Sequence, residues 1–219
     1  MHSYLREEIL EEQLIRKVAP FNAFLEVVAQ TNGDIINYSS IADDIGANYN
    51  STKTYFEILE DTLIGFKLPA YARSIRKRQG QKPKFYLFDT GVKRALDNTL
   101  RSTLPISGKD FGRLFESFIV NECFKLNSYL KRSFKFSFLR VDEALEIDLI
   151  IETPNRKAIL VEIKASDNVN DRHIANILHF SKDFPDCEMY CLSRDPTART
   201  VNGVQLMFWK DGLRKIFIL

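Results

Sequence analysis

The sequence lacks the features that mark secreted, membrane-spanning and zinc-finger proteins. Its three cysteines, Cys123, Cys187 and Cys191, are an odd number without Cys-x-x-Cys spacing. This predicts reduced thiols in a cytoplasmic protein and does not favour disulfides or a zinc site. No apolar run reaches the roughly 18 residues of a transmembrane helix, and the acidic, amphipathic N-terminus is unlike a signal peptide. We therefore expect a cytoplasmic protein without a membrane partner.

A strong excess of charge is also absent, because 31 Lys and Arg residues stand against 29 Asp and Glu residues. The basic residues nevertheless gather in two segments without any acidic residue, 63–88 and 125–140. Clustered positive charge suggests a polyanion such as DNA as partner. For either segment alone, a solvated face balanced by acidic helices is the simpler interpretation. The candidate nucleic-acid-binding residues are Lys53, Arg73, Arg76, Lys77, Arg78, Lys82 and Lys84.

The first half of the chain has the element order of a winged helix-turn-helix. Apolar spacing and turn residues predict helices at 3–18, 21–30, 41–45 and 52–61, with a serine at the end of "IINYSS" suited to capping the third. Two extended runs follow, at 63–72 and 83–89, separated by the basic segment "RSIRKRQGQK". Three helices and then a strand pair predict a winged helix near 20–90, within a module of residues 1–97.

The predicted recognition helix gives a mixed signal. It begins with Ser51, Thr52, Lys53 and Tyr55, which suit DNA contacts, but Glu57, Glu60 and Asp61 in its second half would repel phosphates. The basic residues of the wing instead favour DNA binding, because they can contact phosphates. DNA binding and protein docking both remain open for this module.

A polar connector at 98–108, rich in Asn, Ser, Thr, Pro and Gly, predicts a domain boundary. The second domain is predicted at 108–219, in a mixed α/β fold with the order αβββαβ. The predicted helices are 111–126 and 170–182, and the predicted strands are 134–140, 145–152, 158–164, 187–192, 204–209 and 214–218.

Charged residues interrupt two predicted strands that otherwise consist mainly of apolar residues, "LEIDLIIE" and "AILVEIK". The turn residues between them predict an antiparallel hairpin. With the turn centred on Asn155, Asp148 faces Glu162 and Glu146 faces Lys164, and facing residues share one side of a sheet. A shift of one residue would separate the two carboxylates.

Two facing carboxylates need a compensating cation. At about 5 Å and an effective dielectric of about 20, their repulsion is on the order of 3 kcal/mol. Either one acid is protonated, or Lys164 or a divalent metal ion lies beside them. A metal held by carboxylates, with a neighbouring lysine, suits phosphodiester hydrolysis. Glu116 on the preceding helix could supply a third carboxylate. A buried ion-pair cluster is the alternative interpretation.

The residues Gly112-x-x-x-Glu116, Glu146-Ile-Asp148 and Val161-Glu-Ile-Lys164 resemble the motifs of the PD-(D/E)xK nuclease superfamily, whose fold is restriction-endonuclease-like. The resemblance implies Asp148 and Glu162 as ligands of Mg²⁺ or Mn²⁺, Lys164 as the catalytic lysine and Glu116 as the acid on the helix. The proline of the family name is replaced by Ile147. Some members carry a glutamine on the next helix; here His173, Asn176 and His179 take no carried-over role.

Nearly the whole chain resembles the C-terminal half of prokaryotic AAA+-type ATPases of largely unknown function, through "YLREEILEEQLIRK", "INYSSIADDIGANYNSTKTYFEILEDTLIGFKLPAY", "KFYLFDTGVKRAL" and "FGRLFESFIVNE". The resemblance implies a winged helix joined to the nuclease-like domain. Such proteins also carry an N-terminal ATPase domain, and if this chain serves only for docking, an AAA+ ATPase domain or a second copy of the chain is the expected partner. The sequence contains no GxxxxGK[ST] motif, so we expect no ATP hydrolysis by these residues. The expected activity is metal-dependent DNA hydrolysis; the alternative is a non-cleaving DNA-binding or docking module.

Overall fold

The computed structural model describes residues 18–72, 81–142, 145–155 and 157–218. The chain divides into two compact units, Met1–Lys67 with Lys82–Thr103, and Leu68–Gln81 with Leu104–Leu219. The main division, between Thr103 and Leu104, lies within the polar segment 98–108. The helix predicted at 3–18 lies outside the described residues, apart from its last residue.

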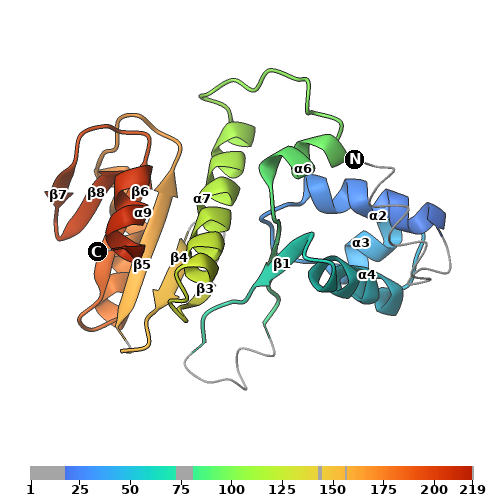
Figure 1. Cartoon of the computed structure of the whole chain (residues 1–219), viewed down its shortest axis with the longest axis horizontal. Helices are drawn as coiled ribbons and strands as arrows, with labels where there is room; N and C mark the ends of the chain where they lie inside the picture. The colour runs from blue at the N-terminus through green and yellow to red at the C-terminus, as the bar shows by residue number, and fades with distance from the viewer. Residues whose placement is uncertain (1–17, 73–80, 143–144, 156, 219) are drawn as a thin grey trace. The chain divides into compact units, whose positions relative to one another are not determined.

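The first unit contains helices and one strand pair (Figure 1). Its elements are α2 (Val18–Gln30), α3 (Tyr38–Asp44), α4 (Tyr49–Asp61), β1 (Gly65–Leu68), β2 (Lys84–Leu87) and α6 (Thr90–Leu96). Asparagines rather than serines cap the short helices, since Asn37 accepts a hydrogen bond from the Ser40 amide and Asn48 from the Ser51 amide. The predicted serine cap is therefore wrong. Pro20 lies in the first turn of α2, where a missing N–H costs little.

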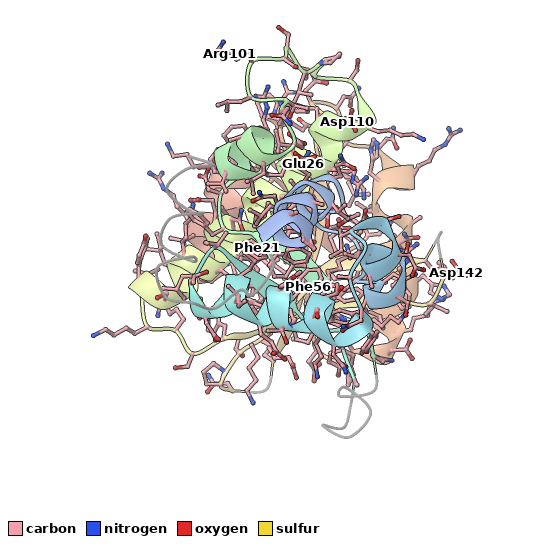
Figure 2. All side chains as sticks on the ribbon, turned by 90° about the vertical axis from the view of Figure 1, so that its right-hand side faces the viewer. Phe21, Glu26, Phe56, Arg101, Asp110 and Asp142 are labelled. Carbon is pink, nitrogen blue, oxygen red and sulfur yellow. The ribbon has the colours of Figure 1, made fainter. Side chains whose placement is uncertain are left out.

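An aromatic cluster holds the helices of the first unit together. Phe24 packs edge-to-face on Phe56 with ring centroids 4.9 Å apart, and Phe56 packs on Phe85 of β2 at the same distance. Phe21 meets Tyr55 at 5.1 Å. Figure 2 looks onto this unit, and the labels of Phe21 and Phe56 mark its core. These contacts join α2 and α4 to the strand pair, because each ring buries a large apolar area.

The extended run predicted at 63–72 serves both units. Its first part is β1, whereas residues 69–71 belong to the second unit. There the Phe138 amide donates to the Pro69 carbonyl at 3.1 Å, and the Tyr71 amide donates to the Phe138 carbonyl at 2.6 Å. The segment thereby covers part of a sheet edge that would otherwise expose unpaired backbone groups.

The second unit is built on a six-stranded sheet in the order β3-β4-β5-β6-β8-β7. Strands β3, β4 and β5 are antiparallel, β5, β6 and β8 are parallel, and β7 is antiparallel to β8. The strands are β3 (Lys135–Arg140), β4 (Glu146–Glu152), β5 (Ala158–Lys164), β6 (Glu188–Ser193), β7 (Arg199–Val201) and β8 (Val204–Phe208).

Helices cover both faces of this sheet. Cys191 packs in one cluster with Ile177 and Phe180 of α8, whereas the neighbouring Leu192 meets Gly212 of α9. Successive strand residues point to opposite faces, so α8 and α9 lie on opposite sides. Helix α7 lies beside α9 (Figure 1), and the Phe118 ring of α7 packs edge-to-face on Trp209. The helical elements are α7 (Lys109–Tyr129), η1 (Asp171–Ile174), α8 (Ala175–Phe180), η2 (Ser181–Asp183) and α9 (Trp209–Phe217).

The strand predicted at 214–218 is wrong, because this segment belongs to α9. Leu213, Ile216 and Phe217 are buried at the spacing of one helical face. Gly212 lets the helix approach the sheet, since a Cβ there would lie 2.2 Å from Leu192 Cδ2. The short strand β7 was not predicted. The mixed α/β class is confirmed, and the order helix, three strands, helix, strand is present from α7 to β6.

Candidate active site

The pairing of β4 with β5 has the predicted register. Leu149 pairs with Val161 and Ile150 with Leu160. The regular pairing ends at Leu149, next to an irregularity in the β3–β4 pairing, so side-chain contacts locate Asp148 relative to β5. The Asp148 carboxylate accepts a hydrogen bond of 2.7 Å from the Ile163 amide, so this side chain is bound to the facing strand.

Lys164 joins the two acids. Its Nζ lies 2.5 Å from Glu162 Oε1 and 3.8 Å from Asp148 Oδ2. The three predicted residues therefore converge at the carboxyl end of β5. Glu146, which was predicted to face Lys164, instead lies beside Arg140, with the Arg140 Nε atom 3.6 Å from its Oε2 atom.

The cluster is buried and electrostatically unbalanced. Asp148 is 8% exposed and Glu162 only 2%. Burial, followed by the charge of Asp148, raises the pKa of Glu162 to about 8, although Lys164 acts in the opposite direction. Burial alone would lower the pKa of Lys164, but Asp148 and Glu162 outweigh it and the pKa is raised. The lysine is thus held as a cation between the two acids.

One oxygen of this cluster has no protein partner. Glu162 Oε2 is buried and, within the described part of the chain, accepts no hydrogen bond. A buried carboxylate oxygen without a donor carries an uncompensated desolvation cost. It is the atom at which an additional cation would gain most.

Glu116 of α7 influences the pair from further away. Its charge is the last of the causes that raise the pKa of Glu162. Across the described residues, no group of three or more His, Cys, Asp or Glu side chains could hold a metal ion. The structure therefore brings together Asp148, Glu162 and Lys164, and the role of Glu116 as a third ligand stays a prediction.

The site lies on the face of the sheet that α8 covers, because Glu162 pairs in register with Cys191. Burial raises the pKa of the Cys191 thiol to about 12. Cys123 is buried as well, and all three cysteines are unpaired, which agrees with the prediction of reduced thiols. No described helix has the length and apolarity needed to cross a membrane.

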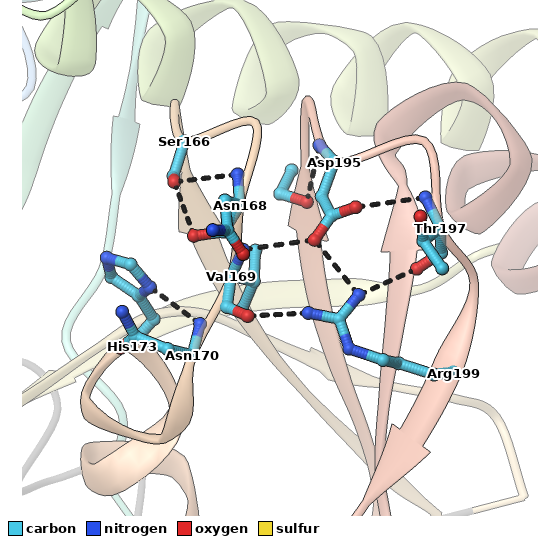
Figure 3. A network of polar contacts seen from close by, with 9 residues as sticks. Ser166, Asn168, Val169, Asn170, His173, Asp195, Thr197 and Arg199 are labelled. Carbon is cyan, nitrogen blue, oxygen red and sulfur yellow. Dashed lines mark hydrogen bonds and ion pairs between the residues drawn. The ribbon is translucent and has the colours of Figure 1, made fainter.

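A polar network around a single carboxylate, Asp195, lies at the same edge of the sheet (Figure 3). Asp195, in the loop after β6, accepts hydrogen bonds from the Val169 amide at 3.0 Å and the Thr197 amide at 2.9 Å. Arg199 binds the Asp195 carboxylate at 2.9 Å and the Val169 carbonyl at 2.5 Å. The hydrogen bonds from the two backbone amides, and to a smaller extent the contact with Arg199, lower the pKa of Asp195 to about 2. The network connects the loops that follow β5 and β6.

His173 of η1 has a local structural role. Its Nδ1 accepts a hydrogen bond of 3.0 Å from the Asn170 amide, while the Asn170 side chain caps the helix (Figure 3). Burial and then the charge of Lys164 lower the pKa of His173. The lowered pKa favours the neutral ring, in which Nδ1 can accept this hydrogen bond.

The candidate DNA-binding residues are placed unevenly. Lys53 on α4 and Lys82 before β2 are exposed, whereas Lys84 is buried and 4% exposed, which does not suit a phosphate contact. Thr52 and Tyr55 at the start of the predicted recognition helix are also buried. Arg73, Arg76, Lys77 and Arg78 lie outside the described residues.

The second basic segment, 125–140, is partly engaged in contacts within the protein. Lys125 pairs with Glu122 at 3.0 Å, and Arg132 Nε donates to the Phe217 carbonyl at 2.7 Å. These contacts favour the interpretation of this segment as a balanced surface.

Comparisons with known proteins match two separate parts of the chain. Residues 1–103 match a family described as "Domain of unknown function (DUF8612)". Residues 111–207 match another, "Domain of unknown function (DUF4143)". Uncharacterized proteins of Mycobacterium tuberculosis and Mycobacterium bovis are each 25% identical over 131 residues. The match covers 59% of this chain but only 29% of each relative. No solved structure matches this protein.

Proposed function

We propose that the second unit is a restriction-endonuclease-like domain that hydrolyses DNA phosphodiester bonds with Mg²⁺ or Mn²⁺. The observation that carries this proposal is the meeting of Asp148, Glu162 and Lys164 at one strand end, with Glu162 Oε2 unpartnered among the described residues. Structural ion pairs normally satisfy all their buried oxygens. This cluster keeps two acids and one unused oxygen in a buried place, which is typical of a site prepared for a further cation.

The donor set fits Mg²⁺ or Mn²⁺. Both ions prefer carboxylate oxygens, and Mg²⁺ sites commonly use one or two protein carboxylates completed by water and substrate phosphate. Asp148 and Glu162 would hold the ion. When bound, the metal would polarise the phosphoryl oxygen and lower the pKa of a water molecule.

Lys164 would act as a donor, not as a base. The two acids raise its pKa, so its ammonium is charged at neutral pH. A charged amine at this position can orient the attacking water and stabilise the negative charge that develops on the phosphoryl oxygens. Its side chain is 31% exposed, in contrast to 3% for Glu162. In this proposal a substrate phosphate would approach from the side of Lys164, the most exposed of the three side chains.

The first unit would act as a winged helix. Three helices followed by the pair β1–β2 support this assignment, together with the sequence resemblance. Lys53 and Lys82 are its exposed basic residues within the predicted DNA-binding set. In the same proposal an AAA+ ATPase domain is a candidate partner.

A protein-docking role of the first unit is the second candidate function. Helices α3 and α4 carry Asp43, Asp44, Glu57, Glu60 and Asp61 against a single basic residue, Lys53. This surface repels phosphates and suits a basic protein partner. Charge reversal at Asp43 and Asp44 tests the choice. It strengthens DNA binding if the helices face DNA, and it weakens capture of an ATPase partner if they dock protein.

The test of the proposed function is plasmid cleavage by the purified full chain in Mn²⁺ or Mg²⁺. We expect nicking that requires the metal and is abolished by Asp148→Asn and by Lys164→Ala. Asp211→Asn, which removes an exposed acid on α9, is the matched control and should cleave normally. Absence of nicking, or nicking that persists in the two site variants, would show that another function must be sought.

A further inference from the structure

Arg194 lies at the end of the strand next to Lys164. In the parallel pairing of β5 with β6, Lys164 is level with Ser193. Arg194 follows directly, and its backbone amide donates to the Ser166 carbonyl at 3.0 Å. Adjacent strands lie about 4.8 Å apart, so the backbone of Arg194 is a close neighbour of the proposed catalytic lysine.

The guanidinium of Arg194 makes one long hydrogen bond and one aromatic contact within the described part of the chain. Its Nη1 donates to the Ala165 carbonyl at a long distance of 3.4 Å, and its Cζ lies 5.5 Å from the centre of the Phe111 ring in the first turn of α7. An arginine has five N–H donors, and a ring face occupies none of them. Within the part of the chain that the structure describes, the remaining donors have no protein acceptor.

Arg199 shows how a structural arginine of this unit differs. Its guanidinium donates to the Asp195 carboxylate and to the carbonyls of Thr197 and Val169, at 2.5 to 3.0 Å. Both terminal nitrogens of Arg199 are therefore used within the protein. Arg194 has no carboxylate partner among the described residues, although it is five positions away in the sequence. The Phe111 ring and the Ala165 carbonyl orient its guanidinium, whose other N–H donors remain available to a ligand.

The side chain approaches the site from the other face of the sheet. Lys164 and Ser193 share the face that α8 covers, so the next residue, Arg194, points to the opposite face, where it meets Phe111 of α7. A nucleic acid strand crossing the carboxyl edge of β5 and β6 would meet Lys164 from one side and Arg194 from the other.

We propose that Arg194 binds a phosphate of duplex DNA beside the one that is cleaved and so positions the strand over Lys164. This proposal rests on the function proposed above. The planar guanidinium can bind two phosphate oxygens at once, and the contact with Phe111 orients it before the substrate arrives. It is a positioning residue, because it touches the substrate away from the reacting atoms.

The test is binding of a short fluorescein-labelled DNA duplex to the full chain without a divalent metal, followed by fluorescence anisotropy at several salt concentrations. We expect Arg194→Ala to weaken binding about tenfold and to lower the salt slope by about one unit. Arg194→Lys should recover part of the affinity, since lysine keeps the charge but not the fork. Arg214→Ala removes an exposed arginine of α9 and should change the affinity less than about twofold.

Cleavage kinetics in Mn²⁺ provide the second readout. Arg194→Ala should raise KM by the same factor as the dissociation constant and leave kcat within about threefold, as a lost binding contact does. Thermal melts of each variant identify a folding defect, and Arg194→Gln then serves as the smaller change.

Two outcomes would overturn the proposal. One is equal DNA affinity of the Arg194→Ala and Arg214→Ala variants; the other is wild-type binding weaker than about 100 μM at low salt. The result separates from the proposed function. An Arg194 effect on binding without any cleavage keeps the phosphate contact of Arg194 but refutes hydrolysis, and with it the positioning over Lys164. Normal binding by Arg194→Ala with Lys164-dependent cleavage refutes the phosphate contact and supports hydrolysis.

Discussion

Two buried acids at one edge of the same sheet have opposite surroundings. Asp195 is 5% exposed and receives two backbone amides and Arg199, which lower its pKa to about 2. Glu162 is 2% exposed, lies beside another acid and leaves one oxygen unpartnered within the described chain, and its pKa is raised to about 8. Both side chains have little solvent exposure, but the acid at Asp195 is satisfied and the acid at Glu162 is not.

The difference indicates separate roles for the two clusters. Buried polar groups in a stable fold are paired, as Asp195 is, and they connect segments of the chain. A ligand-binding site keeps unsatisfied charge before its ligand binds, and this lowers the stability of the fold. We therefore assign Asp195 to the integrity of the loops after β5 and β6, and Glu162 to the proposed chemistry.

The largest expected effect is on cleavage. Glu162→Gln keeps the shape of the side chain but removes a metal-binding charge, so plasmid nicking in Mn²⁺ should fall about a thousandfold. Asp195→Asn, assayed well below its melting temperature, should stay within about tenfold of the wild type. Equal losses in both variants would erase the proposed distinction between the clusters.

The next effect is on stability. Asp195→Ala removes the acceptor of two backbone amides and leaves Arg199 without its carboxylate. The free energy of unfolding should therefore drop by about 3 kcal/mol. Urea denaturation followed by circular dichroism measures this. A loss below about 0.5 kcal/mol, the range of an ordinary surface change, would show that the network has no structural role.

A substitution in the candidate active site should instead raise the free energy of unfolding. Glu162→Gln removes the cost of burying an acid beside Asp148, which the raised pKa of Glu162 reflects, and the same denaturation measurement without metal should show a free energy of unfolding about 1 kcal/mol higher. A decrease of that size would mean that the bond to Lys164 outweighs the repulsion. The cluster would then be an ordinary ion-pair network.

The smallest effect concerns acid stability. The folded pKa of Asp195 is about 2, below its usual 3.8. Its contribution to stability is complete above pH 3.8 and is lost as the pH falls towards 2. Between about pH 4 and pH 2, the wild type should therefore lose more stability than Asp195→Asn, as measured by thermal melts in matched salt. Parallel melting curves for the two proteins would contradict this cause of the lowered pKa.

The candidate site was accessible to sequence reasoning because its geometry is local. Turn residues between β4 and β5 set the register of Leu149 to Glu152, and Asp148 reaches Lys164 one residue before this paired stretch. The burial of Lys84 and the helical form of 214–218 were missed, since both depend on packing against distant segments.

The Asp195 network could not be predicted for a related reason. Its bonds join residues 26 and 30 positions apart, Val169 with Asp195 and with Arg199. The loop sequence "RDPTAR" carries ordinary turn residues and gives no sign of these partners. Arg194 was missed likewise, because its position depends on a ring in α7.

The most direct test of the account is Mn²⁺ binding to the full chain, followed by electron paramagnetic resonance with and without a short DNA duplex. We predict saturable binding that disappears in Glu162→Gln and in Asp148→Asn and persists in Asp195→Asn. Binding that survives loss of Glu162, or no saturable binding by the wild type even with DNA present, would contradict the claim that these two acids are arranged to hold a metal ion.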